Sequence, residues 1–317
     1  MAGKPNHDPK VIIYGDGAVG VGLASLLTEI GLAIRFMGRS GPVAVDARVQ
    51  PFDPSKATWH GQFPAATEAD LAGAELAIFT VKAFDLPKAL KSVVALPDGC
   101  PVWPLSNGAI YQDLAASVND RPDLIWRLGY CTFGISVTEE RNYAWRSNSG
   151  EFAIGPWGML PSDGAEPTPM EQKIIQRLPR KFKWHQNIVW LHRRKWLFNT
   201  VINSMTATRQ LRRNGDLLAD LPSLVAVFHE AWMLGSELWG EWPLAREDVY
   251  QSLLKLIEAT ADNENSMARD TRSGRVTESD YLAGLARDSK KYPLLTAMHR
   301  KLKTNQPLDT AKQMSSG

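Results

Sequence analysis

One apolar segment of the sequence carries three polar residues at a regular spacing. In "KWLFNTVINSMTA", Lys195, Asn199 and Asn203 recur every four residues, so they share one face of a helix. A lysine there can stabilise the negative charge that develops on a ketone oxygen during reduction, and it can deliver a proton. The alternative is structural: the asparagines bridge backbone groups in the core and the lysine extends to solvent.

A second segment, "VIIYGDGAVGVGLASLL", has the pattern of a strand, a glycine-rich turn and a helix. Gly15 allows a tight turn, Gly17 lets the backbone approach a pyrophosphate, and Gly20 lets the helix pack closely. The helix N-terminus offers free N–H groups to phosphates. The alternative is a turn with incidental glycines. The segment predicts a dinucleotide site built from Gly15, Asp16, Gly17, Ala18, Val19 and Gly20.

The end of the second predicted strand, "RFMGRSG", indicates which dinucleotide is bound. An acidic residue there would accept hydrogen bonds from the ribose of NAD, but the only acid between Gly20 and Asp46 is Glu29, inside the preceding helix. Arg39 occupies the place instead, and an arginine suits the 2′-phosphate of NADP. The alternative is an ordinary exposed arginine.

These residues need a scaffold, and the pattern predicts two domains. Residues 11–128 alternate short apolar runs with helical periods, which predicts a parallel sheet covered on both faces. Residues 132–188 read as short strands and turns with one helix near 168–178, and "GPWGMLPSDGAEPTP" reads as loop. From residue 189 the pattern is helical. We therefore expect an α/β, Rossmann-type dinucleotide-binding domain over residues 1–186 and an all-helical domain over residues 187–317.

Composition narrows the classes of protein. A chain of 317 residues with a net charge of +2 lacks the concentrated positive charge that nucleic acids and anionic membranes select. Two cysteines exclude a disulfide framework and suit a reducing cytosol. No segment approaches a membrane span in length, and the polar N-terminus lacks a signal peptide's apolar core. Six histidines form no ligand-like cluster, so we expect a cytoplasmic protein without a metal.

With these motifs in hand, the sequence resembles the ketopantoate reductase (2-dehydropantoate 2-reductase) family. The resemblance spans nearly the whole chain in order. It is carried by the glycine turn, "TVKAF" with Lys82, "LSNGAI" with Asn107, "KWLFNTVINSMTA", and "NSMARDTRSGRVTESDYLAG". The last two motifs are the specific ones.

The resemblance implies a Rossmann domain followed by a helical domain, with the active site in the cleft. It implies that Lys195 is the general acid, assisted by Glu278, and that Lys82 lies at the nicotinamide ribose. Glu278 would oppose the effect of desolvation on the lysine. The implied substrate ligands are Asn107, which also orients the nicotinamide, together with Asn199, Asn203 and Ser266.

The chain departs from the family pattern at three places. Asp85 stands where the family usually has Gln, and a carboxylate near phosphates is unfavourable. Ser204 replaces the usual Pro or Gly, and the usual E-I-D is here Glu278-Ser279-Asp280.

The expected function is the NADPH-dependent reduction of a 2-oxo acid to a 2-hydroxy acid, with ketopantoate as the favoured substrate. One alternative is a related reductase with another 2-oxo acid; the late motif argues against a 3-hydroxyacid or opine dehydrogenase. The other is a non-catalytic NADP(H)-binding sensor, whose signature would be loss of Lys195 or Glu278, and both are present. A homodimer is compatible with the sequence.

Overall fold

The computed structural model describes residues 10–139, 141–147, 149–158 and 166–304. The chain divides into two compact units, Met1–His192 and Arg193–Gly317. The division lies a few residues beyond the expected boundary near residue 187, within one continuous helix. The polar N-terminus considered above, residues 1–9, lies outside the described residues. Each unit is described below by itself.

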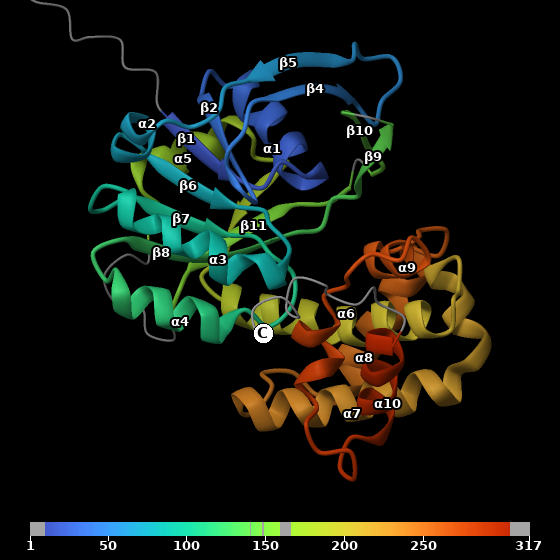
Figure 1. The fold of residues 1–317 in the computed structure, drawn as a ribbon. Helices are drawn as coiled ribbons and strands as arrows, with labels where there is room; N and C mark the ends of the chain where they lie inside the picture. Colours follow the sequence, from blue (N-terminus) through green and yellow to red (C-terminus); the bar gives the residue numbers. More distant parts are fainter. Residues whose placement is uncertain (1–9, 140, 148, 159–165, 305–317) are drawn as a thin grey trace, which may run out of the picture. The chain divides into compact units, whose positions relative to one another are not determined.

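The first unit is built on an eight-stranded sheet in the order β12-β11-β8-β7-β6-β1-β2-β3 (Figure 1). The five strands from β8 to β2 pair in parallel, which confirms the parallel sheet expected for residues 11–128. Outside that core, β11 pairs antiparallel with β8, and β3 antiparallel with β2. The strands are β1 (Lys10–Tyr14), β2 (Ala33–Gly38), β3 (Gly41–Pro42), β6 (Leu76–Phe79), β7 (Pro101–Pro104), β8 (Ile125–Cys131), β11 (Phe152–Pro156) and β12 (Phe182–Trp184).

Helices cover both faces of this sheet, as the Rossmann-type prediction requires. Leu23 and Leu27 of α1 and Ile174 of α5 share a buried apolar cluster with Val11 and Ile13 of β1. The α3 and α4 helices lie over the other face, in front of the sheet in Figure 1. The helices of this unit are α1 (Ala18–Glu29), α2 (Glu68–Ala72), η1 (Ala83–Asp85), α3 (Leu86–Leu90), η2 (Lys91–Ala95), α4 (Tyr111–Asp120) and α5 (Pro169–Arg177).

A second, four-stranded sheet in the order β5-β4-β10-β9 covers α1, and the sequence analysis did not identify most of it. Burial alternates residue by residue along β4, which is the period of a strand with one face buried. Ile135 of β9 and Trp145 of β10 contact α1 where Gly22 leaves room for them. The strands are β4 (Val45–Gln50), β5 (Trp59–Phe63), β9 (Ile135–Glu139) and β10 (Asn142–Trp145).

The prediction that "GPWGMLPSDGAEPTP" is entirely loop was wrong at its start. Gly155 and Pro156 are the last residues of β11 and pair with Leu128 and Arg127 of β8. Glycine is required in this strand because a Cβ there would lie 2.0 Å from the His185 carbonyl oxygen. Residues 159–165 of that segment lie outside the described residues.

A buried ion pair ties α5 to the large sheet. The Arg127 guanidinium and the Glu171 carboxylate are 2.7 Å apart, and their side chains are 1% and 0% exposed. The same carboxylate accepts hydrogen bonds from the Trp103 indole (2.7 Å) and from the Thr168 amide (2.7 Å). Each carboxylate oxygen is therefore satisfied, as a charge buried in a low-dielectric interior requires.

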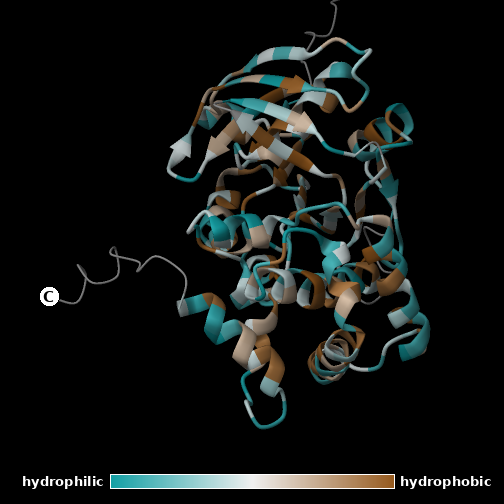
Figure 2. Ribbon diagram, turned by 90° about the vertical axis from the view of Figure 1, so that its right-hand side faces the viewer, coloured by the Kyte–Doolittle hydropathy of each residue, from teal (hydrophilic) through white to brown (hydrophobic). Residues whose placement is uncertain are grey.

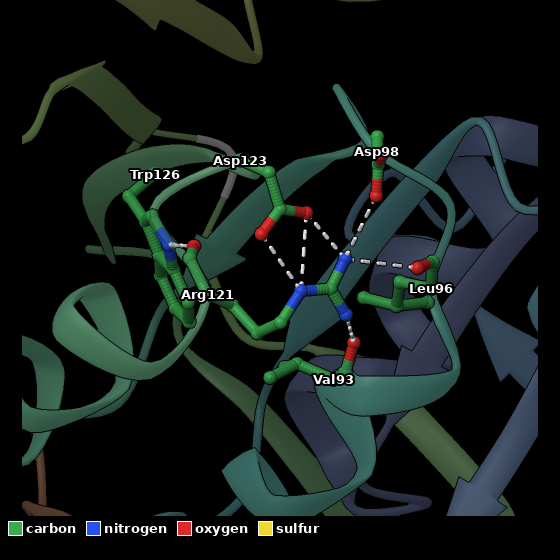
Figure 3. A network of polar contacts seen from close by, with 6 residues as sticks. All are labelled: Val93, Leu96, Asp98, Arg121, Asp123 and Trp126. Carbon is green, nitrogen blue, oxygen red and sulfur yellow. Dashed lines mark hydrogen bonds and ion pairs between the residues drawn. The ribbon is translucent and has the colours of Figure 1, made fainter.

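A second arginine, Arg121, lies at the C-terminal end of α4 (Figure 3). Arg121 donates to the carbonyl groups of Val93 (2.7 Å) and Leu96 (3.1 Å), which tethers η2 to the end of α4. Its guanidinium also binds Asp123 and lowers the pKa of that carboxyl to about 2. Because the folded pKa is depressed, this contribution to stability is present above pH 4 and is lost as the pH falls toward 2.

The second unit is helical, as expected, and brown and teal alternate along its helices in Figure 2. Leu197 and Val201 of the first helix and Leu224, Leu253 and Leu295 of later ones are fully buried. The elements are α6 (Ile188–Thr208, which begins in the first unit), η3 (Asn214–Asp220), α7 (Leu221–Trp239), α8 (Arg246–Ala259), α9 (Ser266–Arg272), η4 (Ser279–Tyr281), η5 (Ala283–Leu285) and α10 (Pro293–Thr304).

One stretch contradicts the expectation that no segment approaches a membrane span in length. Residues Asn214–Trp239 form 26 helical residues with a mean hydropathy of 1.3 in their most apolar window. However, this stretch changes from η3 to α7 at Asp220, and α7 contributes Leu224, Phe228 and Leu234 to the interior. Its Glu230 carboxylate accepts hydrogen bonds from the first amides of α10. These contacts pack one face of α7 against the other helices of this unit.

The buried pair leads to a prediction about stability. Glu171→Gln leaves the Arg127 charge buried without its counter-ion, so we expect the free energy of unfolding to fall by about 3 kcal/mol or more. Urea unfolding of the purified protein measures the loss. The matched control is Glu68→Gln, an exposed residue in the first turn of α2, which should cost less than about 1 kcal/mol. Equal losses in the two variants would contradict the role assigned to the buried pair.

Candidate functional site

The glycine turn follows β1 directly, and its three glycines meet different constraints. Gly15 has a φ of +114°, which favours glycine. A Cβ on Gly20 would lie 2.0 Å from the Gly15 carbonyl oxygen, so the first turn of α1 packs on the turn itself. Gly17 caps α1 with an extended backbone, and a Cβ there would meet nothing within 4 Å. Neither the backbone angle nor packing within the protein therefore requires a glycine at position 17, and the space beside it is open.

Two residues that the sequence analysis missed hold this turn in place. The Thr80 hydroxyl, just after β6, lies within hydrogen-bond distance of the Tyr14 (3.2 Å) and Gly15 (3.0 Å) carbonyl oxygens. The Tyr143 hydroxyl, on β10, donates to the carbonyl of Asp16 (3.3 Å). Burial, reinforced by the nearby Asp16 charge, raises the pKa of Tyr143, so its hydroxyl remains protonated and able to donate.

The other candidate cofactor residues of the first unit gather at the same edge of the sheet. Arg39 follows β2, Lys82 follows β6 and Asn107 follows β7, so all three lie where parallel strands end. Ser106 donates a hydrogen bond to the Val81 carbonyl (2.7 Å) and joins the loops that carry Asn107 and Lys82. This carboxyl edge is where open α/β sheets bind ligands.

The structure pairs Arg39 with Asp85, the residue that departs from the family pattern. The guanidinium Nη2 and the carboxylate Oδ2 are 2.8 Å apart. The arginine side chain is 67% exposed and the aspartate side chain 21%. The carboxylate expected to disfavour phosphates is thus held by the arginine expected to bind one.

The turn has the chemistry that a dinucleotide requires. The N-terminus of α1 has no side-chain cap and no acidic residue in its first turn, so its N–H groups face the open space at Gly17. Unpaired amides at a helix N-terminus attract anions. Gly15, Asp16, Gly17, Ala18, Val19 and Gly20 therefore form a cradle that fits a pyrophosphate, and their roles in binding remain predictions.

In the second unit, the three polar residues of α6 form a stripe between buried neighbours. Lys195, Asn199 and Asn203 are all partly buried, whereas Leu197 and Val201 between them are fully buried. At 1.5 Å per residue the stripe is about 12 Å long. The nearby departure, Ser204, is fully buried in the same helix.

Ser266 is brought to the C-terminal end of α6 by its neighbour. Asn265 caps α9 through the Ala268 amide (3.0 Å) and donates from its Nδ2 to the Thr206 hydroxyl (2.6 Å). Thr206 lies three residues beyond Asn203 on α6. Asn265 therefore holds Ser266, the exposed first residue of α9, near this end of the polar stripe. Asn265 escaped the sequence analysis, although an asparagine just before a helix is a recognisable cap.

Glu278 is anchored near the other end of the stripe. The Trp196 indole donates to the Tyr281 carbonyl (3.1 Å), which fixes η4 to the residue that follows Lys195. Glu278 immediately precedes η4 and is only 6% exposed. The second unit thus collects Lys195, Asn199, Asn203, Ser266 and Glu278 around α6, and the first unit collects the cofactor candidates. Within the described part of the chain, no group of three or more metal-ligating side chains occurs.

The open space at Gly17 allows binding to be separated from folding. Gly17→Val adds a side chain where a pyrophosphate would lie, so we expect NADPH affinity to fall about tenfold or more without loss of stability. Gly20→Ala instead forces a clash inside the protein and should lower stability by about 1–3 kcal/mol. Fluorescence titration and thermal unfolding of both variants measure the two effects. Unchanged NADPH affinity in the Gly17 variant would contradict the prediction that this turn binds the pyrophosphate.

Comparison with known proteins places this arrangement in a family. The model of "Ketopantoate reductase PanE/ApbA" matches residues 11–158, and that of its C-terminal domain matches residues 187–300. A 2-dehydropantoate 2-reductase of Vibrio cholerae is 26% identical over 305 residues, covering 93% of this chain and 97% of the relative.

Solved structures with the same fold include the following two. A D-mandelate dehydrogenase with NADH and anilino(oxo)acetate has a TM-score of 0.75 at 17% identity, over 93% of this chain and 97% of its own. A dimeric ketopantoate reductase from Staphylococcus aureus has a TM-score of 0.72 at 15% identity, over 94% and 98%. Together with the matched family models, the glycine turn and the polar stripe show that this chain belongs to the ketopantoate reductase family, whose members are oxidoreductases.

Proposed function

We propose that the protein reduces a 2-oxo acid to a 2-hydroxy acid with NADPH, and that its substrate is ketopantoate, the product being pantoate. The observation that carries the proposal is the polar stripe of α6, with Lys195 partly buried at one end. Along one partly buried face, this apolar helix presents an ammonium group and two amides, which can donate hydrogen bonds to the ketone oxygen and the polar groups of a small acid. The family assignment supports the same chemistry.

In the proposed reaction the first unit binds the cofactor. The amides at the start of α1 bind the pyrophosphate, Arg39 binds the 2′-phosphate, and Lys82 and Asn107 bind and orient the nicotinamide riboside. When bound, a reduced nicotinamide supplies the hydride that the ketone carbon accepts.

The second unit supplies the proton and holds the substrate. Lys195 stabilises the negative charge that grows on the ketone oxygen and donates a proton to it, which gives the alcohol. Glu278, which is nearly buried and immediately precedes η4, assists Lys195. Ser266 binds the substrate carboxylate, and Asn199 and Asn203 bind the hydroxyl at its far end.

Two other functions remain to be distinguished. The similar D-mandelate dehydrogenase favours a reductase of this kind with another 2-oxo acid. A non-catalytic NADP(H) sensor would bind cofactor without turnover. We place the proposed enzyme in the cytoplasm, as a homodimer, with a small 2-oxo acid as its partner and neither nucleic acid nor membrane.

Lys195 is the residue to test for the mechanism. Lys195→Ala should lower kcat by roughly 10²–10⁴-fold, because general acid catalysis is lost, with little change in NADPH affinity. The matched control is Lys301→Ala, an exposed lysine of α10, which should keep normal turnover. A near-normal kcat in the Lys195 variant would show that this lysine is not the general acid and would favour a structural role.

The substrate proposal is tested with NADPH oxidation across a panel of 2-oxo acids. A site that hydrogen-bonds a substrate hydroxyl rejects the analogue that lacks it, because its polar groups are left unpaired. We therefore expect a larger kcat/KM for ketopantoate than for 2-oxoisovalerate, which lacks the hydroxymethyl group. A larger kcat/KM for an unrelated 2-oxo acid would remove ketopantoate from the proposal. Bound NADPH with no turnover on any acid would favour the sensor.

A further inference from the structure

Asp85 is placed to act on the cofactor site from the side opposite Arg39. In the sheet, β1 lies between β2 and β6: Tyr14, at the end of β1, pairs with Met37 on one side and Phe79 on the other. Arg39 follows β2 and Asp85 lies in η1, which follows β6. Their ion pair therefore joins the two loops that flank the glycine turn.

The direction of the Asp85 side chain is informative. Asp85 is the N-cap residue of α3, where an aspartate commonly accepts a hydrogen bond from its own helix, yet it makes no such side-chain cap. Its carboxylate instead receives Nη2 of Arg39 at 2.8 Å. The arginine that would neutralise a 2′-phosphate thus already has a counter-ion.

The pair has opposite consequences for the two nicotinamide cofactors. A 2′-phosphate must compete with the Asp85 carboxylate for the same guanidinium, and it would carry its negative charge close to that carboxylate. The free 2′- and 3′-hydroxyls of an NADH ribose can donate hydrogen bonds to a carboxylate, as they do to the acid that usually ends the second strand. No acid lies at that place here, and Asp85 supplies one from η1, which follows β6 on the other side of β1.

We propose that Asp85 is a specificity-determining residue of the cofactor site, which restrains the preference for NADPH and admits NADH as a second cofactor. This inference rests on the proposed function, because it requires a nicotinamide dinucleotide at the glycine turn. Because the Arg39 side chain is 67% exposed, water screens the pair, and a 2′-phosphate can displace the carboxylate. The wild-type preference for NADPH is therefore modest.

The test compares dissociation constants for NADPH and NADH in the wild type and in Asp85→Asn. The amide keeps the shape of the side chain and removes its charge. We expect NADPH to bind about 1.5-fold to fivefold more tightly in the variant, the range of one exposed charge contact, while NADH binds equally or more weakly. Calorimetry with two fragments that lack the nicotinamide should show the same changes. Adenosine 2′,5′-bisphosphate stands for NADPH and AMP stands for NADH.

Two further variants complete the design. Asp98→Asn removes the same charge from an exposed residue that precedes β7, at the opposite edge of the sheet, and should leave the ratio of the two constants unchanged. Arg39→Ala should weaken NADPH binding far more than NADH binding.

The outcomes separate the inference from the proposed function. If the wild type binds both cofactors and Asp85→Asn leaves their ratio unchanged, or changes it no more than Asp98→Asn does, the role of Asp85 is wrong and the reductase proposal stands. If the wild type binds neither cofactor nor AMP, the proposed function fails as well. Equal weakening of both cofactors by Arg39→Ala would overturn the pairing argument.

Discussion

The candidate cofactor site depends on a backbone constraint at the end of β1. The chain must leave the strand through a left-handed residue and start a helix at once, and Gly15 provides the positive φ. The first turn of α1 then packs so closely on this residue that Gly20 has no room for a Cβ. With Thr80 holding the turn from the neighbouring loop, the N-terminus of α1, which has no side-chain cap, faces open space at the carboxyl edge. Arg39, Lys82 and Asn107 reach the same edge because their strands run parallel.

The second unit uses a different device, in which one helix organises the site. The buried residues of α6 fix its orientation in the core, and this leaves Lys195, Asn199 and Asn203 along a partly buried face. Hydrogen bonds from Trp196 to Tyr281 and from Asn265 to Thr206 attach the segments that carry Glu278 and Ser266. Apolar packing holds α6 in place, and the three polar side chains of the stripe supply its chemistry.

Sequence reasoning succeeded where the information is local. The glycine turn, the parallel strands and α6 each follow from a period or a spacing within one short segment. The four-stranded sheet was not predicted because β4 pairs with β10, almost one hundred residues further along the chain. No pattern within either segment indicates that contact. For the same reason the Thr80 and Tyr143 contacts with the turn were not predicted.

Asp85 illustrates the limit most clearly. The sequence marks it as a departure from the family, but its partner Arg39 lies 46 residues away, just after β2. Only the order of the strands in the sheet brings the two residues together on either side of the turn. A residue that looked unfavourable for phosphate binding becomes, in its structural setting, a candidate for controlling which cofactor binds.

We propose that this protein moves a hydride from a reduced nicotinamide to the ketone carbon of a 2-oxo acid. The most direct measurement uses NADPH deuterated at C4 of the nicotinamide, in separate incubations with each stereoisomer, and mass and NMR analysis of the product formed from ketopantoate. We expect one stereoisomer to yield pantoate one mass unit heavier, with the deuterium on C2. Product without deuterium from either stereoisomer, or no 2-hydroxy acid at all while NADPH is bound, would contradict it.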